Sequence, residues 1–164
     1  MKYLLTGLVV LAFVSNSFAQ AWSEDFEGAW PPPGWSVSNG VWGHETEFGH
    51  ESQRSAGTTP GGNYPDGVSS RLATHSFLVP TDNPRLRFWH WFSFSSSDLG
   101  RVQVLPQGAT EWVNASPTYY NTGSNMWTYP SVDLSDYAGQ NIQIGFYFEA
   151  TDAVIEVQPS MYIF

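Results

Sequence analysis

Two segments of the chain alternate apolar and polar residues with a period of two. In residues 85–94, one set of alternate positions is apolar or aromatic, namely Leu86, Phe88, His90, Phe92 and Phe94. The other set carries Arg85, Arg87, Trp89, Trp91 and Ser93. Residues 142–149 repeat this separation. Such alternation is typical of strands that bury one face in an antiparallel sheet.

Glycine and proline divide the rest of the chain into short segments, with 15 Gly and 11 Pro among 164 residues. Strand patterns also occur at 22–27, 35–43, 71–79, 101–105, 111–115 and 126–132, whereas 44–69 reads as a loop and 135–138 as one helical turn. We find no extended segment with a helical period of 3.6 residues. The pattern predicts an all-β, two-sheet antiparallel jelly-roll sandwich.

The first residues have the form of an export signal. Lys2 precedes an apolar stretch from Leu4 to Val14, and Ser17 and Ala19 place small residues where a signal peptidase cuts. The stretch is shorter than a membrane-spanning helix. We therefore predict a signal peptide over 1–19 and a single β-sandwich domain over 20–164. Export without any cysteine favours a bacterial secreted or cell-surface protein and excludes disulfides and thiolate metal sites.

The charge balance limits the partners. The chain has 15 Asp and Glu, 6 Lys and Arg, and a formal net charge of −9. An acidic surface repels phosphate backbones and anionic headgroups, so neither nucleic-acid binding nor membrane insertion is expected. An extracellular glycan or protein surface remains a suitable partner.

Several motifs together resemble a known family. These are Phe26-Glu27-Gly28 before Pro32–Trp35, then Leu86–His90 and Asp98–Val104, and finally Trp127 with Val132–Gln140 and Ile142–Phe146. In order and spacing they are similar to cleaved-adhesin and choice-of-anchor J domains, of which MAM domains are distant relatives. Similar modules follow the catalytic domain in immune inhibitor A-type metallopeptidases. The resemblance implies a jelly-roll β-sandwich of secreted or surface-anchored proteins, and it does not imply an enzymatic activity for this module.

The resemblance also implies a structural calcium site. Glu27 matches the acidic residue of the family's first strand, and Asp98 is a second candidate ligand; an alternative is that Glu27 is a solvated strand-end carboxylate. The family's terminal aspartate pair is absent, because Met161–Phe164 only begins that last strand. We therefore expect an incomplete calcium site, an apparently truncated final strand and an open sheet edge that favours self-association or needs a larger polypeptide.

The polar faces of the two alternating strands suggest a binding surface. Arg87, Trp89 and Trp91 lie on one, and Gln143 and Tyr147 on the other. If the strands are neighbours, these residues form an aromatic platform for sugar rings or a protein partner. The alternative is that this side is covered. His90, on the apolar side, is expected to be a hydrogen-bonded core histidine.

No motif supplies catalytic groups together. His44-Glu45 begins like the zinc-peptidase motif H-E-x-x-H, but Phe48 stands where the second histidine is needed. His44 and His50 are an alternative transition-metal pair with no defined spacing. The sequence therefore predicts a non-catalytic adhesion or ligand-recognition module, with an accessory domain of a secreted metallopeptidase as the alternative and a small hydrolase as the third possibility.

Overall fold

The computed structural model describes residues 22–51, 53–58, 64, 67–94, 97–151 and the strand 160–163. The predicted signal peptide, 1–19, lies outside these residues, so it and the domain boundary behind it stay predictions. In the described part, no helix is both long and apolar enough to cross a membrane.

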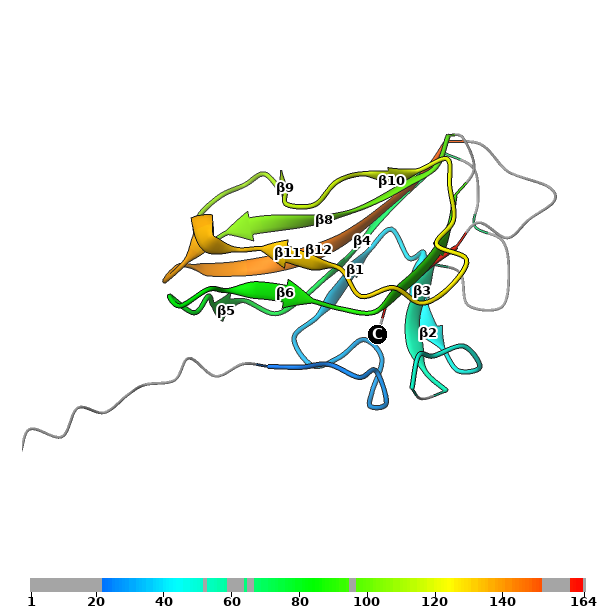
Figure 1. The fold of residues 1–164 in the computed structure, drawn as a ribbon, viewed down its shortest axis with the longest axis horizontal. Helices are drawn as coiled ribbons and strands as arrows, with labels where there is room; N and C mark the ends of the chain where they lie inside the picture. Colours follow the sequence, from blue (N-terminus) through cyan, green and yellow to red (C-terminus); the bar gives the residue numbers. More distant parts are fainter. Residues whose placement is uncertain are drawn as a thin grey trace, which may run out of the picture.

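One antiparallel sheet contains seven strands, and its three longest run along the molecule in Figure 1. Its order is β1 (Ser36–Ser38), β4 (Val68–Ala73), β12 (Asn141–Ala150), β8 (Leu99–Pro106) and β10 (Tyr119–Tyr120). Two short strands complete it: β5 (Phe77–Leu78), which pairs with β12, and β9 (Val113–Asn114), which pairs with β8.

The opposing layer is built from two smaller sheets. The first has the order β2 (Trp42–Glu45), β3 (Ser55–Thr58), β13 (Ser160–Ile163) and β7 (His90–Ser93). The second pairs β6 (Arg85–Arg87) with β11 (Ser131–Asp133). Because β6 leads into β7 after two residues, and His90 bridges to Thr128, the two sheets continue one another. The predicted all-β antiparallel jelly-roll sandwich is confirmed.

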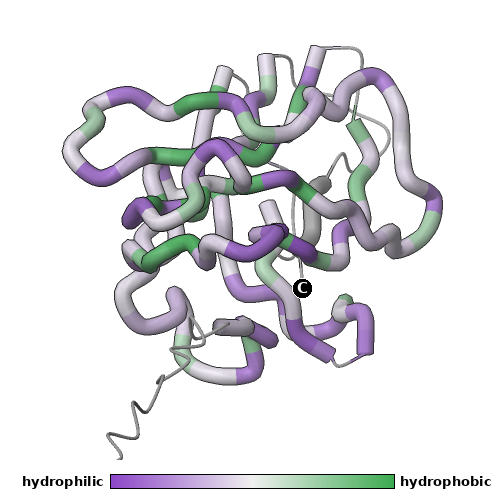
Figure 2. The backbone as a smooth tube through the Cα atoms, turned by 60° about the vertical axis from the view of Figure 1, so that its left-hand side comes forward, coloured by the Kyte–Doolittle hydropathy of each residue, from purple (hydrophilic) through white to green (hydrophobic). Residues whose placement is uncertain are grey.

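The core lies between the layers and follows the predicted alternation. In β12 the buried side chains are Ile142, Ile144, Phe146 and Phe148, each at most 3% exposed. On the opposing layer Phe88, His90, Phe92 and Phe94 are buried. Figure 2 shows the corresponding change between apolar and polar segments along the backbone. Burial of one face per strand is therefore what holds the two layers together.

Three expected elements differ. Residues 22–27 form no strand: Phe26 has φ 55°, and the carboxylates of Glu24 and Asp25 accept hydrogen bonds from the backbone N–H groups of Phe26 and Glu27. Such local side-chain bonds compete with a strand ladder. Residues 44–69, expected as a loop, contain β3 and the start of β4. Residues 85–94 form two strands instead of one.

Two further expectations concern short segments. The helical turn is confirmed as the 3-10 helix η1 (Ser135–Tyr137). At the other end of the chain, residues 160–163 form β13, which pairs with β3 on one side and β7 on the other. The expectation of an open edge where a final strand is missing is therefore wrong at this position, because four residues suffice to join these neighbours.

A candidate ligand-binding cleft and a metal-site prediction

The expected aromatic platform is divided between two sheets. Trp89 and Trp91 lie in or beside β7, which pairs with β13. Gln143 and Tyr147 lie on β12, whose partners are β4, β5 and β8. The condition that the two strands are neighbours is not met, so the five predicted residues do not share one surface. Whether each binds a ligand stays a prediction.

Two of the predicted residues, Arg87 and Trp89, instead line a cleft of about 500 Å³. The cleft lies between the segment Trp22–Phe26, strand β6 and the residues around β5. Its aromatic lining includes Trp22, Trp89 and Tyr129, and its charged lining is Glu24, Arg85 and Arg87. The contribution of Trp22 and Glu24 was not predicted, because the pattern of residues 22–27 indicated a strand.

The aromatic rings of the cleft are held by their neighbours. Trp89 stacks on His50 with 3.7 Å between ring centroids, and Tyr129 lies 4.7 Å from the Trp89 ring. Trp22 meets Trp35 and Phe77 edge-on. Tyr129 nevertheless keeps 53% of its surface exposed. A ligand therefore meets preformed ring surfaces, and little side-chain freedom is lost on binding.

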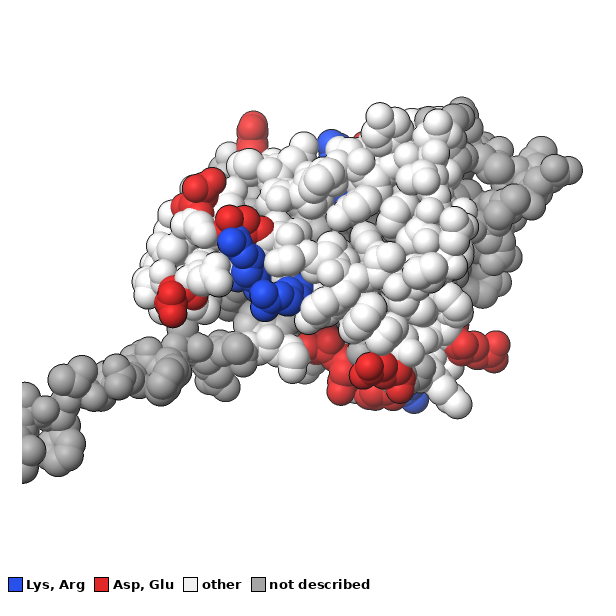
Figure 3. All heavy atoms as spheres, in the orientation of Figure 1, with Lys and Arg blue, Asp and Glu red and all other residues white. Residues whose placement is uncertain are grey.

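The two arginines of the cleft differ in their partners. Arg85 forms an ion pair with Asp133. This pair, with the hydrogen bonds from Ser135, holds the pKa of the Asp133 carboxyl well below its usual range. Arg87 is exposed, and within the described residues it has neither an ion pair nor a hydrogen bond. Figure 3 shows blue arginine atoms over β6, next to red carboxylates and a wide uncharged area. Arg87 is thus the donor available to a ligand.

Trp91 does not line the cleft, but its ring belongs to a series of ring contacts that continues through Trp127 and His50 to Trp89. Phe48 meets it edge-on, with 5.6 Å between centroids, and stacks on Trp127. The ring of Trp91 is consequently half-buried. The alternative expectation of a covered aromatic face therefore describes Trp91 better than an open platform does.

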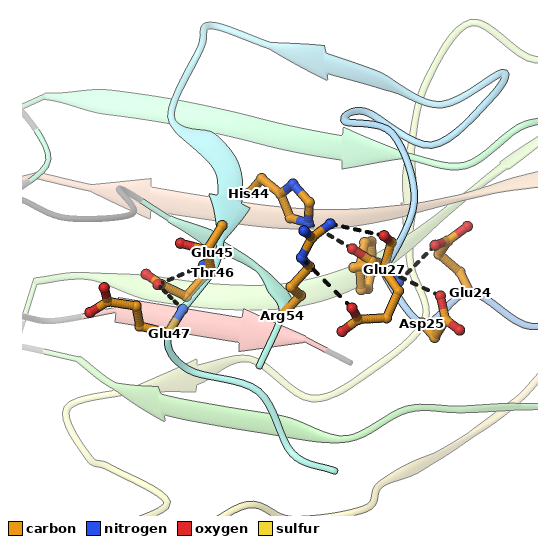
Figure 4. Close-up of polar contacts among 9 residues, drawn as sticks. Glu24, Asp25, Glu27, His44, Glu45, Thr46, Glu47 and Arg54 are labelled. Atoms are coloured by element: carbon orange, nitrogen blue, oxygen red, sulfur yellow. Dashed lines mark hydrogen bonds and ion pairs between the residues drawn. The ribbon is translucent and has the colours of Figure 1, made fainter. Parts of the chain in front are cut away.

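The candidate calcium ligands are engaged elsewhere. Figure 4 shows the Arg54 guanidinium facing Glu27. Its Nε lies 3.7 Å from Glu27 Oε2, and its Nη1 donates to the Glu27 carbonyl at 2.9 Å. Asp98 is fully buried and accepts hydrogen bonds from the Tyr64 hydroxyl and the Thr151 N–H. Calcium needs six to eight oxygen ligands.

Across the described residues, no group of three or more acidic or histidine side chains could hold a metal ion. Calcium binding by Glu27 and Asp98 stays an untested prediction. His44 and His50 have separate partners: His44 Nε2 lies 2.6 Å from the Phe26 carbonyl, whereas His50 stacks on Trp89.

His90 has the expected core position. It is 3% exposed, and it packs against Phe88, Phe92 and Tyr119. The expected hydrogen bond is missing at its Nδ1, which is buried and has no partner among the described residues. Burial among these rings disfavours the imidazolium and lowers the pKa of His90 to about 4.

Comparison with known proteins identifies both a relative and the fold. No family model matches the chain. Over 150 residues, 86% of this chain, the sequence is 31% identical to Bacillopeptidase F of Bacillus subtilis (strain 168), and it spans 10% of that protein's length.

Two solved structures are similar along most of their length. The K3 cleaved adhesin domain of Lys-gingipain from Porphyromonas gingivalis W83 is 20% identical, covers 88% of this chain and 95% of its own, and has a TM-score of 0.61. The carbohydrate-binding module TmCBM61, solved with β-1,4-galactotriose, is 15% identical, covers 79% and 83%, and has a TM-score of 0.55. The chain thus shares the β-sandwich fold of these domains.

Proposed function

We propose that this chain is a non-catalytic module of a secreted or surface-attached bacterial protein, and that it binds carbohydrate in the cleft beside Trp89. The observation that carries the proposal is the preformed pairing of Trp89 and Tyr129 next to the uncompensated Arg87. The flat apolar faces of sugar rings pack on aromatic rings, while their hydroxyl groups accept hydrogen bonds from a guanidinium. A few polar groups in a mainly apolar cleft are the usual composition of a ligand site.

The comparisons support this proposal at the level of fold. A carbohydrate-binding module and a cleaved adhesin domain use the same sandwich. A shared fold does not determine a ligand, so the argument rests on the cleft. Assignment to the cleaved-adhesin and choice-of-anchor J family belongs to the same proposal.

The test measures binding of the secreted chain to soluble β-1,4-galactan and xylan by isothermal titration calorimetry and affinity electrophoresis. We expect Trp89→Ala and Tyr129→Ala each to weaken binding about tenfold or more, the range typical of a central aromatic contact. Trp91→Ala is the matched control, because it removes an indole of the same layer outside the cleft. Melting curves verify that each variant is folded.

Two results would contradict the proposal. If the wild-type chain binds none of a broad set of neutral polysaccharides, the cleft is not a site for neutral carbohydrate. If Trp89→Ala binds as tightly as the wild type, the cleft is not the site.

The second candidate function is that of an accessory domain in a secreted peptidase. It is favoured by the 31% identity to a segment of Bacillopeptidase F. A domain that only stabilises or positions an enzyme needs no glycan site. This candidate therefore predicts that the wild type and Trp89→Ala are equally unretained on every polysaccharide, whereas fusion to the peptidase domain raises the melting temperature of that domain.

A further inference from the structure

A second surface lies on the outer face of the seven-stranded sheet, away from the cleft. Arg71 on β4, Tyr147 on β12 and Arg101 on β8 are in register across three neighbouring strands. All three point away from the core, because the residues before and after Tyr147 on its strand, Phe146 and Phe148, are buried. We call this set, together with Trp112, the arginine row.

The rings and guanidinium groups of the arginine row are stacked. The Arg71 guanidinium carbon lies 4.6 Å from the centroid of Trp112 and 5.1 Å from that of Tyr147. Arg101 lies over the other part of the same surface, 5.0 Å from the Tyr147 centroid. These distances are within the range of favourable cation–π contacts. The two cations are therefore held on either side of one aromatic ring.

Gly145 makes room for this arrangement. A Cβ atom at this position would lie 2.6 Å from Arg71 Cδ and 2.7 Å from the Trp112 ring. Arg71 crosses this space and donates from Nε to Gln103 Oε1 at 2.9 Å, and Gln103 in turn donates to Asn114 at 2.9 Å. The orientation of the Arg71 guanidinium is thus fixed before any ligand binds.

The charges of the arginine row are only partly compensated. Glu149 lies 3.8 Å from Arg101 and also accepts a hydrogen bond from the Tyr147 hydroxyl at 2.8 Å. Within the described residues Arg71 has no ion pair, and the Nε of Arg101 is buried without a hydrogen-bond partner. In a chain of net charge −9, two adjacent arginines with one carboxylate are a local exception.

We propose that the arginine row binds a polysaccharide that carries carboxylate groups, such as a uronic-acid glycan. The sugar ring packs against Trp112 while its carboxylate accepts hydrogen bonds from Arg71, and the carboxylate of another unit of the same chain accepts hydrogen bonds from Arg101 on the other side of Tyr147. A uronate offers a flat apolar face and a carboxylate on one unit, which matches rings and guanidinium groups alternating at about 5 Å. An acidic peptide pairs with arginine but does not need the rings.

The experiment compares polygalacturonate with fully methyl-esterified polygalacturonate as ligands of the secreted chain, by isothermal titration calorimetry at low salt. We expect the acid form to bind at least tenfold more tightly, and its affinity to fall as salt is raised, because exposed charge pairs are screened. Arg71→Gln and Arg71→Lys should both weaken binding about tenfold, since lysine neither stacks nor donates in a planar fork. Arg54→Gln, at an exposed pair with Glu27 outside both the arginine row and the cleft, is the matched control and should bind polygalacturonate normally.

A second variant distinguishes loss of the binding site from loss of the fold. Trp112→Ala removes a ring from a loop position and should weaken polygalacturonate binding while the melting temperature stays close to that of the wild type. The proposal is overturned if acid and ester bind equally, if folded Arg71→Gln binds like the wild type, or if polyglutamate binds as tightly as polygalacturonate. The proposal does not depend on the cleft. Trp89→Ala should therefore still bind polygalacturonate, even if it no longer binds neutral glycans.

Discussion

The Tyr64 hydroxyl donates a hydrogen bond to the fully buried carboxylate of Asp98. Thr151 donates to the other carboxylate oxygen, so Asp98 joins segments far apart in the sequence. Burial, the hydrogen bond and the negative charge of Asp98 all raise the pKa of the Tyr64 phenol. Asp98, predicted from the family resemblance to be a calcium ligand, therefore has a structural role in the described part of the chain.

Removal of this hydrogen bond should cost stability. Tyr64→Phe keeps the ring packed on Phe148 but leaves a buried carboxylate oxygen without its donor. We expect the free energy of unfolding to fall by about 1–3 kcal/mol, measured by urea denaturation. Tyr120→Phe, at a tyrosine that is 60% exposed, is the control and should change little. Equal stability of the two variants would contradict this role of Asp98.

His90 should make the fold less stable in weak acid. Its pKa is lowered from 6.5 to about 4 in the folded chain, so between these pH values the unfolded state binds the proton more strongly. Above pH 6.5, His90 therefore does not lower the free energy of unfolding. As the pH falls toward 4, the free energy of unfolding decreases by up to about 3 kcal/mol.

The pH effect can be measured by urea denaturation at several pH values. In His90→Phe the part of the pH dependence that comes from this group should disappear, whereas His75→Phe, at a half-buried position, should keep it. The same pH profile in the His90→Phe variant would show that another group causes the acid effect.

Gly145→Ala should disturb the arginine row while leaving the sandwich folded. Alanine suits a strand backbone, but its Cβ would contact Arg71 and Trp112 at distances of 2.6 and 2.7 Å. We expect a shifted Trp fluorescence spectrum, a cost of about 1–3 kcal/mol as for other overpacked positions, and weaker polygalacturonate binding. Gly28→Ala, with nothing within 4 Å of the new methyl group, is the matched control. Unchanged fluorescence and affinity would contradict this prediction, because they would mean that Arg71 and Trp112 accommodate the added methyl group.

Calcium should have little effect on stability. Glu27 faces Arg54, and the carboxylates of Glu24 and Asp25 accept hydrogen bonds from the backbone. We expect the melting temperature in millimolar CaCl₂ and in EDTA to agree within about 1 °C, because an ion that binds the folded state raises it. A rise of several degrees with CaCl₂ would reveal an ion site that includes other residues.

The sequence predicted the faces of strands better than their neighbours. Alternation in residues 85–94 identified Phe88, His90 and Phe92 as buried, because side-chain direction is a local property of a strand. Which strands pair depends on the whole chain, so alternation could not show that Trp89 and Tyr147 lie on different sheets. The Trp22 side of the cleft was missed for a related reason, since Glu24 and Asp25 replace a strand ladder with local turns.

The arginine row had one signal in the sequence. Among the polar-face positions of residues 142–149, Gly145 lacks a side chain beside Tyr147. A glycine within a strand often marks a close approach by another group. The identity of that group, Arg71 with Trp112, depends on pairings between segments far apart in the sequence and became clear only from the fold.

The place of β13 between β3 and β7 constrains the order in which this chain folds. Until residues 160–163 have been synthesised, β3 and β7 each present an edge to a strand that does not yet exist. The seven-stranded sheet needs only residues up to 150 and can assemble earlier. The opposing layer is therefore completed by the part of the sandwich that is synthesised last, after every strand of the seven-stranded sheet.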